Sequence, residues 1–252
     1  MRKIDNTRVG VYVDAFNVYY GGRGLCGRHA AGWRWLDLGG LAMDLIDSTL
    51  WPGAMLTRLV YCTAPRDREG DPSSLADQLC YIAALQSHCV GTVIINGRYA
   101  PRTKTGVVVD LRGNRPIRVP SPGFEYIPLW LPAKEVRGPS GGAEVLVSVS
   151  AFEEKGSDVN VASSLLIDVL TGVIDAAIVF SNDSDLEFPL SEARLHVPVA
   201  TVNPSGARRP VALSGKRDDG VGRHWWRTLS AADFRDHQMP EVVGDHRRPA
   251  GW

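Results

Sequence analysis

The sequence has no long apolar run. Its 252 residues contain no stretch of eighteen consecutive apolar residues, and the amino terminus shows no charged segment followed by an apolar one. A membrane-spanning helix needs about 20 apolar residues, and a secretory leader needs the second pattern. We therefore expect neither membrane insertion nor secretion, and we expect the protein to be cytoplasmic.

Cysteine is scarce, and its spacing is not that of a metal site or a disulfide framework. The four cysteines are Cys26, Cys62, Cys80 and Cys89, and no two of them form a C-x-x-C pair. The last three stand in apolar contexts typical of buried thiols. We predict neither disulfides nor a zinc site.

Net charge is absent as well. The 28 basic and 28 acidic residues give a formal net charge of zero, which argues against a protein that coats nucleic acid indiscriminately. Basic residues nevertheless gather in two stretches. The first holds Arg98, Arg102, Lys104, Arg112, Arg115 and Arg118; the second, near Trp225 and Trp226, holds Arg208, Arg209, Lys216, Arg217, Arg223 and Arg227. Basic residues mixed with aromatic ones are typical of a groove for single strands, and the alternative is ordinary solvated surface.

Apolar strands and amphipathic helices alternate along the chain, as in a parallel α/β sheet. With 44% hydrophobic residues, 252 residues can bury one substantial core. We predict strands at residues 9–13, 55–62, 90–95, 178–180 and 197–202. We predict helices at residues 36–50, from Pro72, from Asp158 and from Ser230, and a glycine-rich loop at residues 19–32.

One segment breaks this alternation. Between residues 97 and 144 the sequence has two short β-like runs, at 107–111 and 116–119, turned by Gly113-Asn114, and then a proline-rich stretch. We interpret residues 1–252 as a single domain, with an inserted β-arm at 97–144 and an irregular C-terminal segment at 203–252.

Aspartates stand where the predicted strands end. Asp14 follows the first strand, Asp183 and Asp185 follow the fourth, and Asp158 opens a helix. Because ligands bind beyond the carboxyl ends of strands in an open α/β sheet, these acids can converge, and such a histidine-poor set suits Mg²⁺ or Mn²⁺. Each acid has a structural alternative as a helix cap or turn residue. Asp168, further along the same helix as Asp158, is expected to be solvated or to lie behind the metal ligands.

Three motifs in order carry a family resemblance: Asp-x-x-Asn at residues 14–17, Glu-Glu-Lys-Gly-x-Asp-Val-Asn at 153–160, and Ser-x-Asp-Ser-Asp at 181–185. Through them the chain resembles the NYN domain family, in the LabA/DUF88-like bacterial branch of the PIN-like nucleases, from about Val9 to about Asp233. Asn182 replaces the usual glycine and Leu186 the usual aromatic residue. Asparagine can adopt the left-handed conformation, and leucine keeps an apolar anchor.

The resemblance implies a PIN-like three-layer α/β/α fold and a Mg²⁺- or Mn²⁺-dependent endoribonuclease that hydrolyses single-stranded or structured RNA. It implies that Asp14, Asp158, Asp183 and Asp185 are the catalytic acids and hold one or two metal ions. Asn17, Lys155 and Ser181 are expected to orient the acids or contact phosphate, and Arg98, Arg102 and Lys104 of the first basic stretch are expected to bind RNA. The expected partners are RNA and either a second copy or a regulatory protein, with no membrane.

Other function classes fit these residues less well. A haloacid-dehalogenase phosphatase needs a second acid two positions after the first, where this chain has Phe16. A nicotinamide-binding domain needs G-x-G-x-x-G at the first turn, and Gly21-Gly22-Arg23-Gly24 comes too late. The remaining alternative is a non-catalytic module of the same fold that binds RNA or a protein partner.

Overall fold

The computed structural model describes residues 6–65, 72–109, 118–119, 130–139, 141–206 and 213–252. The chain divides into two compact units, one formed by Met1–Arg98 with Lys155–Trp252 and the other by Tyr99–Glu154. No helix in the described parts of the chain combines the length and the apolar character that a membrane crossing requires.

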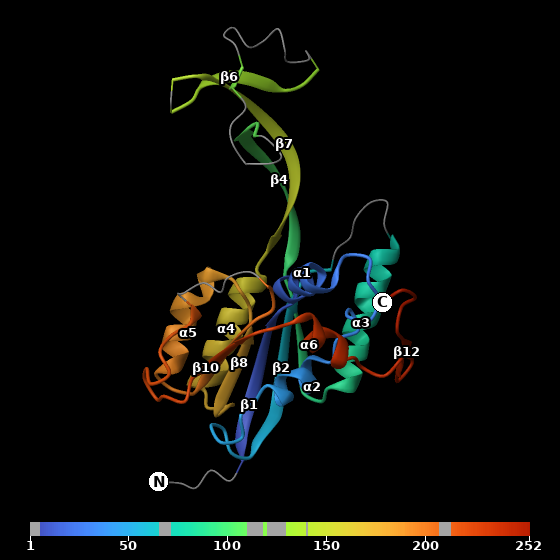
Figure 1. Cartoon of the computed structure of the whole chain (residues 1–252), viewed down its shortest axis with the longest axis vertical. Helices are drawn as coiled ribbons and strands as arrows, with labels where there is room; N and C mark the ends of the chain where they lie inside the picture. Colours follow the sequence, from blue (N-terminus) through green and yellow to red (C-terminus); the bar gives the residue numbers. More distant parts are fainter. Residues whose placement is uncertain (1–5, 66–71, 110–117, 120–129, 140, 207–212) are drawn as a thin grey trace. The chain divides into compact units, whose positions relative to one another are not determined.

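The first unit is built on a six-stranded parallel sheet with the strand order β10-β9-β8-β1-β2-β3 (Figure 1). These strands are β1 (Thr7–Asp14), β2 (Ala54–Thr63), β3 (Thr92–Asn96), β8 (Ala176–Phe180), β9 (Val199–Asn203) and β10 (Trp225–Thr228). The first five match predicted strands, and β10 is an addition. The chain builds outward from β1 to β3 and then returns to β8 on the other side of β1. The strand order therefore reverses between β1 and β8.

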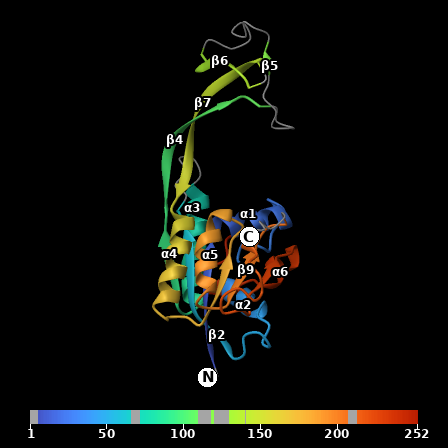
Figure 2. The same cartoon turned by 90° about the vertical axis from the view of Figure 1, so that its left-hand side faces the viewer.

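Helices cover both faces of the sheet, which confirms the expected three-layer α/β/α fold. Side chains alternate between the faces of a strand, so Val11 of β1 faces one core and Tyr12 faces the other. The Val11 side packs against α1 (Ala15–Cys26), α2 (Leu38–Asp44), α3 (Pro72–His88) and α6 (Ala231–Asp236). The Tyr12 side packs against α4 (Ser157–Leu170) and α5 (Glu187–Arg194), which lie next to each other in Figure 2.

Helix α1 contradicts the prediction of a loop from residue 19. Its glycines lower helix propensity, but they permit close packing that a larger residue would prevent. A Cβ added to Gly21 would lie 2.2 Å from the carbonyl oxygen of Pro204, and one on Gly22 would lie 2.8 Å from the rings of Trp33 and Phe234. Tertiary packing thus explains a helix that local sequence does not favour. The helix predicted at residues 36–50 is shorter than expected, since α2 ends at Asp44.

The C-terminal segment is more regular than predicted from residue 203 onward. Besides β10 and α6, it contains an antiparallel pair, β11 (Val242–Val243) and β12 (His246–Arg247). Ser230 caps α6 as predicted: its hydroxyl and the Asp233 carboxylate form a reciprocal capping box.

The second unit is formed by β strands. Its elements are β4 (Arg98–Val107), β5 (Arg118–Val119), β6 (Ala133–Arg137) and β7 (Ala143–Lys155), and β7 pairs with the other three. The unit extends to Glu154, beyond the predicted end of the arm at residue 144. The turn predicted at Gly113-Asn114 lies outside the described residues. In the first unit, the two glycines that flank this segment lie together, because a Cβ on Gly156 would be 3.9 Å from the Cα of Gly97.

Candidate functional site

The candidate site lies at the carboxyl ends of β1 and β8. These neighbouring parallel strands pair Val13 with Phe180, so the residues that follow them, Asp14 and Ser181, meet at one edge of the sheet. This is also where the strand order reverses, the position at which open α/β sheets bind their ligands. The topology thus brings together two of the three motifs found in the sequence.

Asp14 is fixed by three hydrogen bonds. Its side chain is 4% exposed, and Oδ1 accepts the backbone N–H groups of Phe16 and Asn17, both at 3.1 Å. The amide of Asn17 donates to Asp14 Oδ2 at 2.5 Å. Asp14 is therefore the N-cap of α1, as its structural alternative proposed. The cap leaves the carboxylate at the sheet edge in one defined orientation.

Asn17 also ties this carboxylate to the second strand. Its Oδ1 accepts the backbone N–H of Asn182 at 3.2 Å. The backbone N–H of Asp183 donates to the hydroxyl of Ser181 at 3.1 Å, and Asp183 Oδ1 accepts the backbone N–H of Asp185 at 3.1 Å. Asp183 thereby caps the short 3-10 turn η2 (Ser184–Leu186). Residues of two motifs distant in sequence form one hydrogen-bonded group.

Electrostatics couple the two carboxylates. Burial raises the pKa of Asp14 above its ordinary value, and the negative charge of Asp183 raises it further, while hydrogen bonds from Asn17 and Phe16 oppose the rise. Burial also raises the pKa of Tyr61, with a further contribution from the charge of Asp14. The charge of Asp183 thus disfavours the charged form of Asp14, and a bound cation would favour that form.

The other two predicted acids have different surroundings. Asp158 is half-buried in the first turn of α4, but it is not the N-cap, which is Gly156 with φ of 101°. Asp185 is exposed in η2. Across the described ranges, no group of three or more His, Cys, Asp and Glu side chains is arranged to hold a metal ion. The structure thus brings Asp14 and Asp183 to one edge of the sheet, linked through Asn17 and Asn182, and the full set of four acids remains a prediction.

A carboxylate pair is a chemically suitable site for Mg²⁺. This ion commonly binds through one or two carboxylates and keeps several waters or phosphate oxygens as its remaining ligands. Asp14 Oδ2 accepts one hydrogen bond in the described part of the chain, so it retains lone-pair capacity for a cation. The residues present therefore fit a magnesium or manganese ion at Asp14 and Asp183.

Asp168 has a different role from the one expected. It is 4% exposed rather than solvated, and its carboxylate accepts the Tyr12 hydroxyl at 2.8 Å. Its Oδ2 also lies 2.6 Å from Nε of Arg58. Asp168 thus links α4 to β1 and β2 beneath the sheet. This contact could not be predicted from the sequence, because Tyr12 and Arg58 lie on strands far from Asp168 in the chain.

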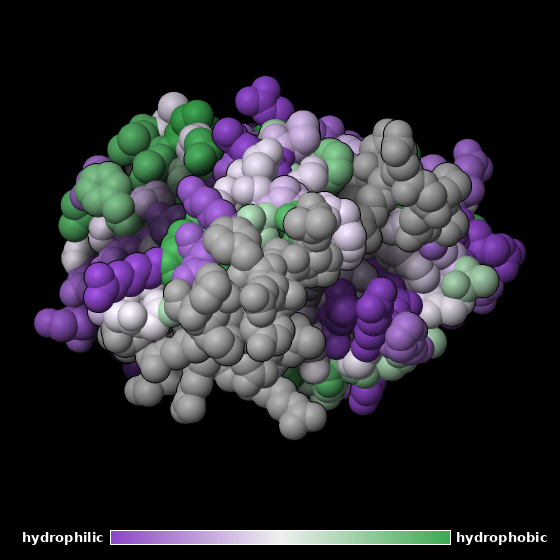
Figure 3. All heavy atoms as spheres, turned by 90° about the horizontal axis from the view of Figure 1, so that it is seen from above, coloured by the Kyte–Doolittle hydropathy of each residue, from purple (hydrophilic) through white to green (hydrophobic). Residues whose placement is uncertain are grey.

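The predicted RNA-contacting cations are divided between the two units. Lys155 and Arg98 are exposed in the first unit, whereas Arg102 and Lys104 belong to the second, where Lys104 pairs with Glu153 at 2.7 Å. Hydrophilic side chains occur in several separate groups on the visible described surface (Figure 3). Four of the basic residues named from sequence, Arg112, Arg115, Arg208 and Arg209, lie outside the described residues.

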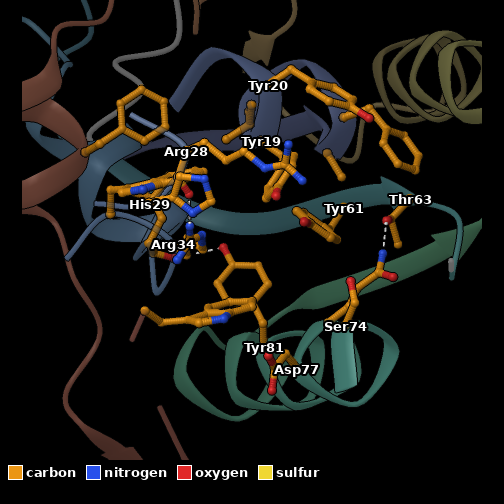
Figure 4. Close-up of a pocket in the computed structure, with 18 residues that line it drawn as sticks. Tyr19, Tyr20, Arg28, His29, Arg34, Tyr61, Thr63, Ser74, Asp77 and Tyr81 are labelled. Atoms are coloured by element: carbon orange, nitrogen blue, oxygen red, sulfur yellow. Dashed lines mark hydrogen bonds between the residues drawn. The ribbon is translucent and has the colours of Figure 1, made fainter. Parts of the chain in front are cut away.

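A cavity beside Asp14 was missed by the sequence analysis. It has a volume of about 350 Å³ and lies among α1, β2, α3 and the C-terminus (Figure 4). Ala15 and Phe16, which follow Asp14 directly, line it together with Tyr61, so the cavity adjoins Asp14. Its aromatic lining residues are Phe16, Tyr19, Tyr20, Trp33, Tyr61, Tyr81, Phe234 and Trp252. The available signal was Tyr19-Tyr20 directly after the Asp-x-x-Asn motif, but the other rings come from distant segments.

Comparisons with known proteins leave the family open. No protein-family model matches the sequence. The chain is 28% identical, over 280 aligned residues, to 6-hydroxy-3-succinoylpyridine 3-monooxygenase HspA of Pseudomonas putida (strain DSM 28022 / S16); the alignment covers 100% of this chain and 78% of that protein. A solved structure of a protein of unknown function from Vibrio parahaemolyticus RIMD 2210633 aligns with a TM-score of 0.45 and 11% identity, over 95% of this chain and 100% of that one. Membership of the NYN family therefore stays a prediction.

Proposed function

We propose that the protein is a divalent-metal-dependent endoribonuclease of the NYN type, with its reaction centre at Asp14 and Asp183. The observation that carries this proposal is the meeting of Asp14 and Asp183, linked through Asn17 and Asn182, at the point where the strand order reverses. Asp14 is buried and Asp183 is half-buried, and neighbouring carboxylates disfavour each other's charged form unless a cation is present, so such a pair is typical of sites that bind metal ions. RNA as the substrate also agrees with the expected cytoplasmic location.

The chain's own residues would prepare this centre. Asp14 and Asp183 would hold the ion, which supplies an activated water and polarises the phosphodiester when bound. Asn17 holds the Asp14 carboxylate in one orientation, and its bond from the backbone N–H of Asn182 keeps the turn after β8 beside Asp14. Asp158 and Asp185 are proposed as further acids of the centre, and Ser181 and Lys155 as phosphate contacts. Because Asn17 positions Asp14, its removal should lower activity less than removal of the acid itself.

The test is RNA cleavage by acid-to-amide variants. Asn caps helices about as well as Asp, so Asp14→Asn and Asp183→Asn should remain folded by circular dichroism. We expect both to lose cleavage of labelled single-stranded RNA in Mg²⁺ or Mn²⁺, and EDTA to abolish the activity of the parent protein. Asp236→Asn, which changes an exposed acid on α6, is the matched control and should cleave normally. Full activity in both Asp14→Asn and Asp183→Asn would contradict the proposal, and RNA binding without cleavage would favour the non-catalytic module.

A second candidate function comes from the relative whose alignment covers the whole chain. That protein is named a monooxygenase of 6-hydroxy-3-succinoylpyridine, and the aromatic cavity beside Asp14 gives this chain a place for a small ring. On this alternative the protein would act on a small aromatic compound. Calorimetry with 6-hydroxy-3-succinoylpyridine tests it directly: binding without RNA cleavage would favour this candidate, and cleavage without such binding would favour the nuclease.

A further inference from the structure

We propose that the aromatic cavity of the first unit is a binding site for a planar aromatic ring that carries an anionic group. The inference does not depend on the proposed hydrolysis, because it concerns the shape and chemistry of the cavity alone. Its volume of about 350 Å³ falls at the lower end of the range for small-molecule sites. The cavity therefore suits one ring with its substituents rather than a length of polymer.

The walls are suited to stacking. The ring centroids of Tyr61 and Tyr81 are 6.0 Å apart with an interplanar angle of 65°, and those of Tyr81 and Trp252 are 6.2 Å apart. Tyr19, which is 41% exposed, lies 5.6 Å from Trp33, so one wall reaches solvent. Figure 4 shows the tyrosine rings of α1, β2 and α3 around the same space. Rings packed at such angles leave faces and edges against which a planar ligand can lie.

Positive charge lies at one side of this space. Arg28, His29 and Arg34 are together in Figure 4, away from Thr63 and Ser74 at the opposite side. The guanidinium of Arg34 stacks 4.9 Å from the Trp33 ring and donates to the backbone carbonyls of Arg28 and of Gly251, the latter at 3.0 Å. A guanidinium held in this way is preorganised to meet an anion. Asp77 is the only acidic residue among the described lining residues, so the two arginines, Arg28 and Arg34, outnumber it.

Polar groups that recognise ring substituents are also present. Trp33 is 2% exposed, and its Nε1 has no hydrogen-bond partner among the described residues. A buried donor without an acceptor is costly, so a ligand acceptor would stabilise it. At the other side, the Gln78 amide donates to Thr63 Oγ1 and to the carbonyl of Ala64, both at 3.2 Å. This holds the Thr63 hydroxyl at this side of the cavity, as a partner for a heteroaromatic edge.

A nucleoside monophosphate and a small aromatic carboxylic acid share the required chemistry. The experiment therefore uses AMP, UMP and 4-hydroxybenzoate as probes, with inorganic phosphate and adenosine as partial ligands, and measures binding to the full chain by calorimetry. We expect at least one of the three ring-bearing anions to bind at least about tenfold more tightly than phosphate, since stacking adds to the charge interaction. Tighter binding of AMP or UMP would identify a nucleotide unit, and tighter binding of 4-hydroxybenzoate a small aromatic acid.

Rim variants assign the binding to this cavity. Tyr19→Ala should weaken binding about tenfold, whereas Tyr19→Phe keeps the ring and should restore it. Arg28→Gln should weaken the anionic probes and leave adenosine unchanged. Phe188→Ala and Arg235→Gln change an exposed ring and an exposed cation outside the cavity, and they should bind as the parent does.

Two outcomes would overturn the inference: equal binding of phosphate and every ring-bearing probe, or unchanged binding in Tyr19→Ala. RNA cleavage is scored separately on the same preparations. Intact cleavage without ring binding would remove the cavity proposal alone, and ring binding without cleavage would remove the nuclease proposal alone.

Discussion

Removal of the Asp168 carboxylate should cost more stability than any substitution of an acid at the candidate site. The carboxylate accepts the hydroxyl of Tyr12, which is 0% exposed, and pairs with Arg58. Without it, the Tyr12 hydroxyl is buried without an acceptor, at a cost of about 1–3 kcal/mol. Breaking a fully buried ion pair costs about 3–5 kcal/mol, but Arg58 has a third of its side chain exposed, so its share is smaller. We expect Asp168→Ala to lower the free energy of unfolding by about 3 kcal/mol in total.

Urea unfolding followed by circular dichroism measures this loss. Tyr12→Phe removes only the hydroxyl and leaves the Asp168–Arg58 pair, so it should cost about 1–2 kcal/mol. In the double variant the two losses should not add, since both break the same contact. Asp218→Ala, at an exposed acid, should change stability by less than about 0.5 kcal/mol. The reasoning would be refuted if Asp168→Ala were as mild as Asp218→Ala, or if the losses of the Tyr12 and Asp168 variants were simply additive.

Three further predictions test the fold around the site. Gly21→Ala should strongly destabilise the protein, because its Cβ would lie 2.2 Å from the backbone oxygen of Pro204. Gly24→Ala has open space around it and should stabilise α1 by up to about 1 kcal/mol, and the melting temperatures of the two variants test both expectations. Ser230→Ala should cost about 1 kcal/mol in urea unfolding through loss of the α6 cap, and Ser230→Thr should retain most of it. Burial lowers the pKa of His237, but its hydrogen bonds to Asp44 and to the backbone outweigh burial, so the pKa is raised overall. The stabilisation from this shift is therefore present below the ordinary pKa of histidine and is lost as the pH rises through the raised pKa of His237. Asp44→Asn should lower the urea midpoint at about pH 5.5 and leave it nearly unchanged at about pH 9.

Hydrophobic pattern predicted the elements that bury apolar runs. Residues 9–13 and 176–180 are apolar throughout and form central strands, and Pro72 begins α3 as a fixed-φ residue should. The pattern failed for α1, because its glycines at 21 and 22 leave room for residues that are distant in the sequence, and local sequence does not reveal this packing. It also missed β10, a short strand whose side chains are mostly exposed, so it carries little apolar signal.

The sequence predicted part of the candidate site for a topological reason. Asp14 and Asp183 follow buried strands, and strand-end position alone suggests that they meet. The same reasoning could not describe Asp168, because helix position says nothing about which strand residue lies beneath it. The cavity was equally hidden, since Tyr61, Tyr81 and Trp252 come from three segments that only the folded sheet brings together.

The proximity of Gly97 and Gly156 has a consequence for how the chain can vary. The chain leaves the first unit just after Gly97 and re-enters it just before Gly156, at nearly the same point, so the length of the segment between them places little geometric demand on the sheet. Loop-closure entropy grows only with the logarithm of length, and halving such a segment changes it by about 0.6 kcal/mol. The sheet that brings Asp14 and Asp183 together should therefore tolerate segments of very different length or structure between Gly97 and Gly156. One appended unit could be exchanged for another at these two glycines while the parallel sheet stays the same.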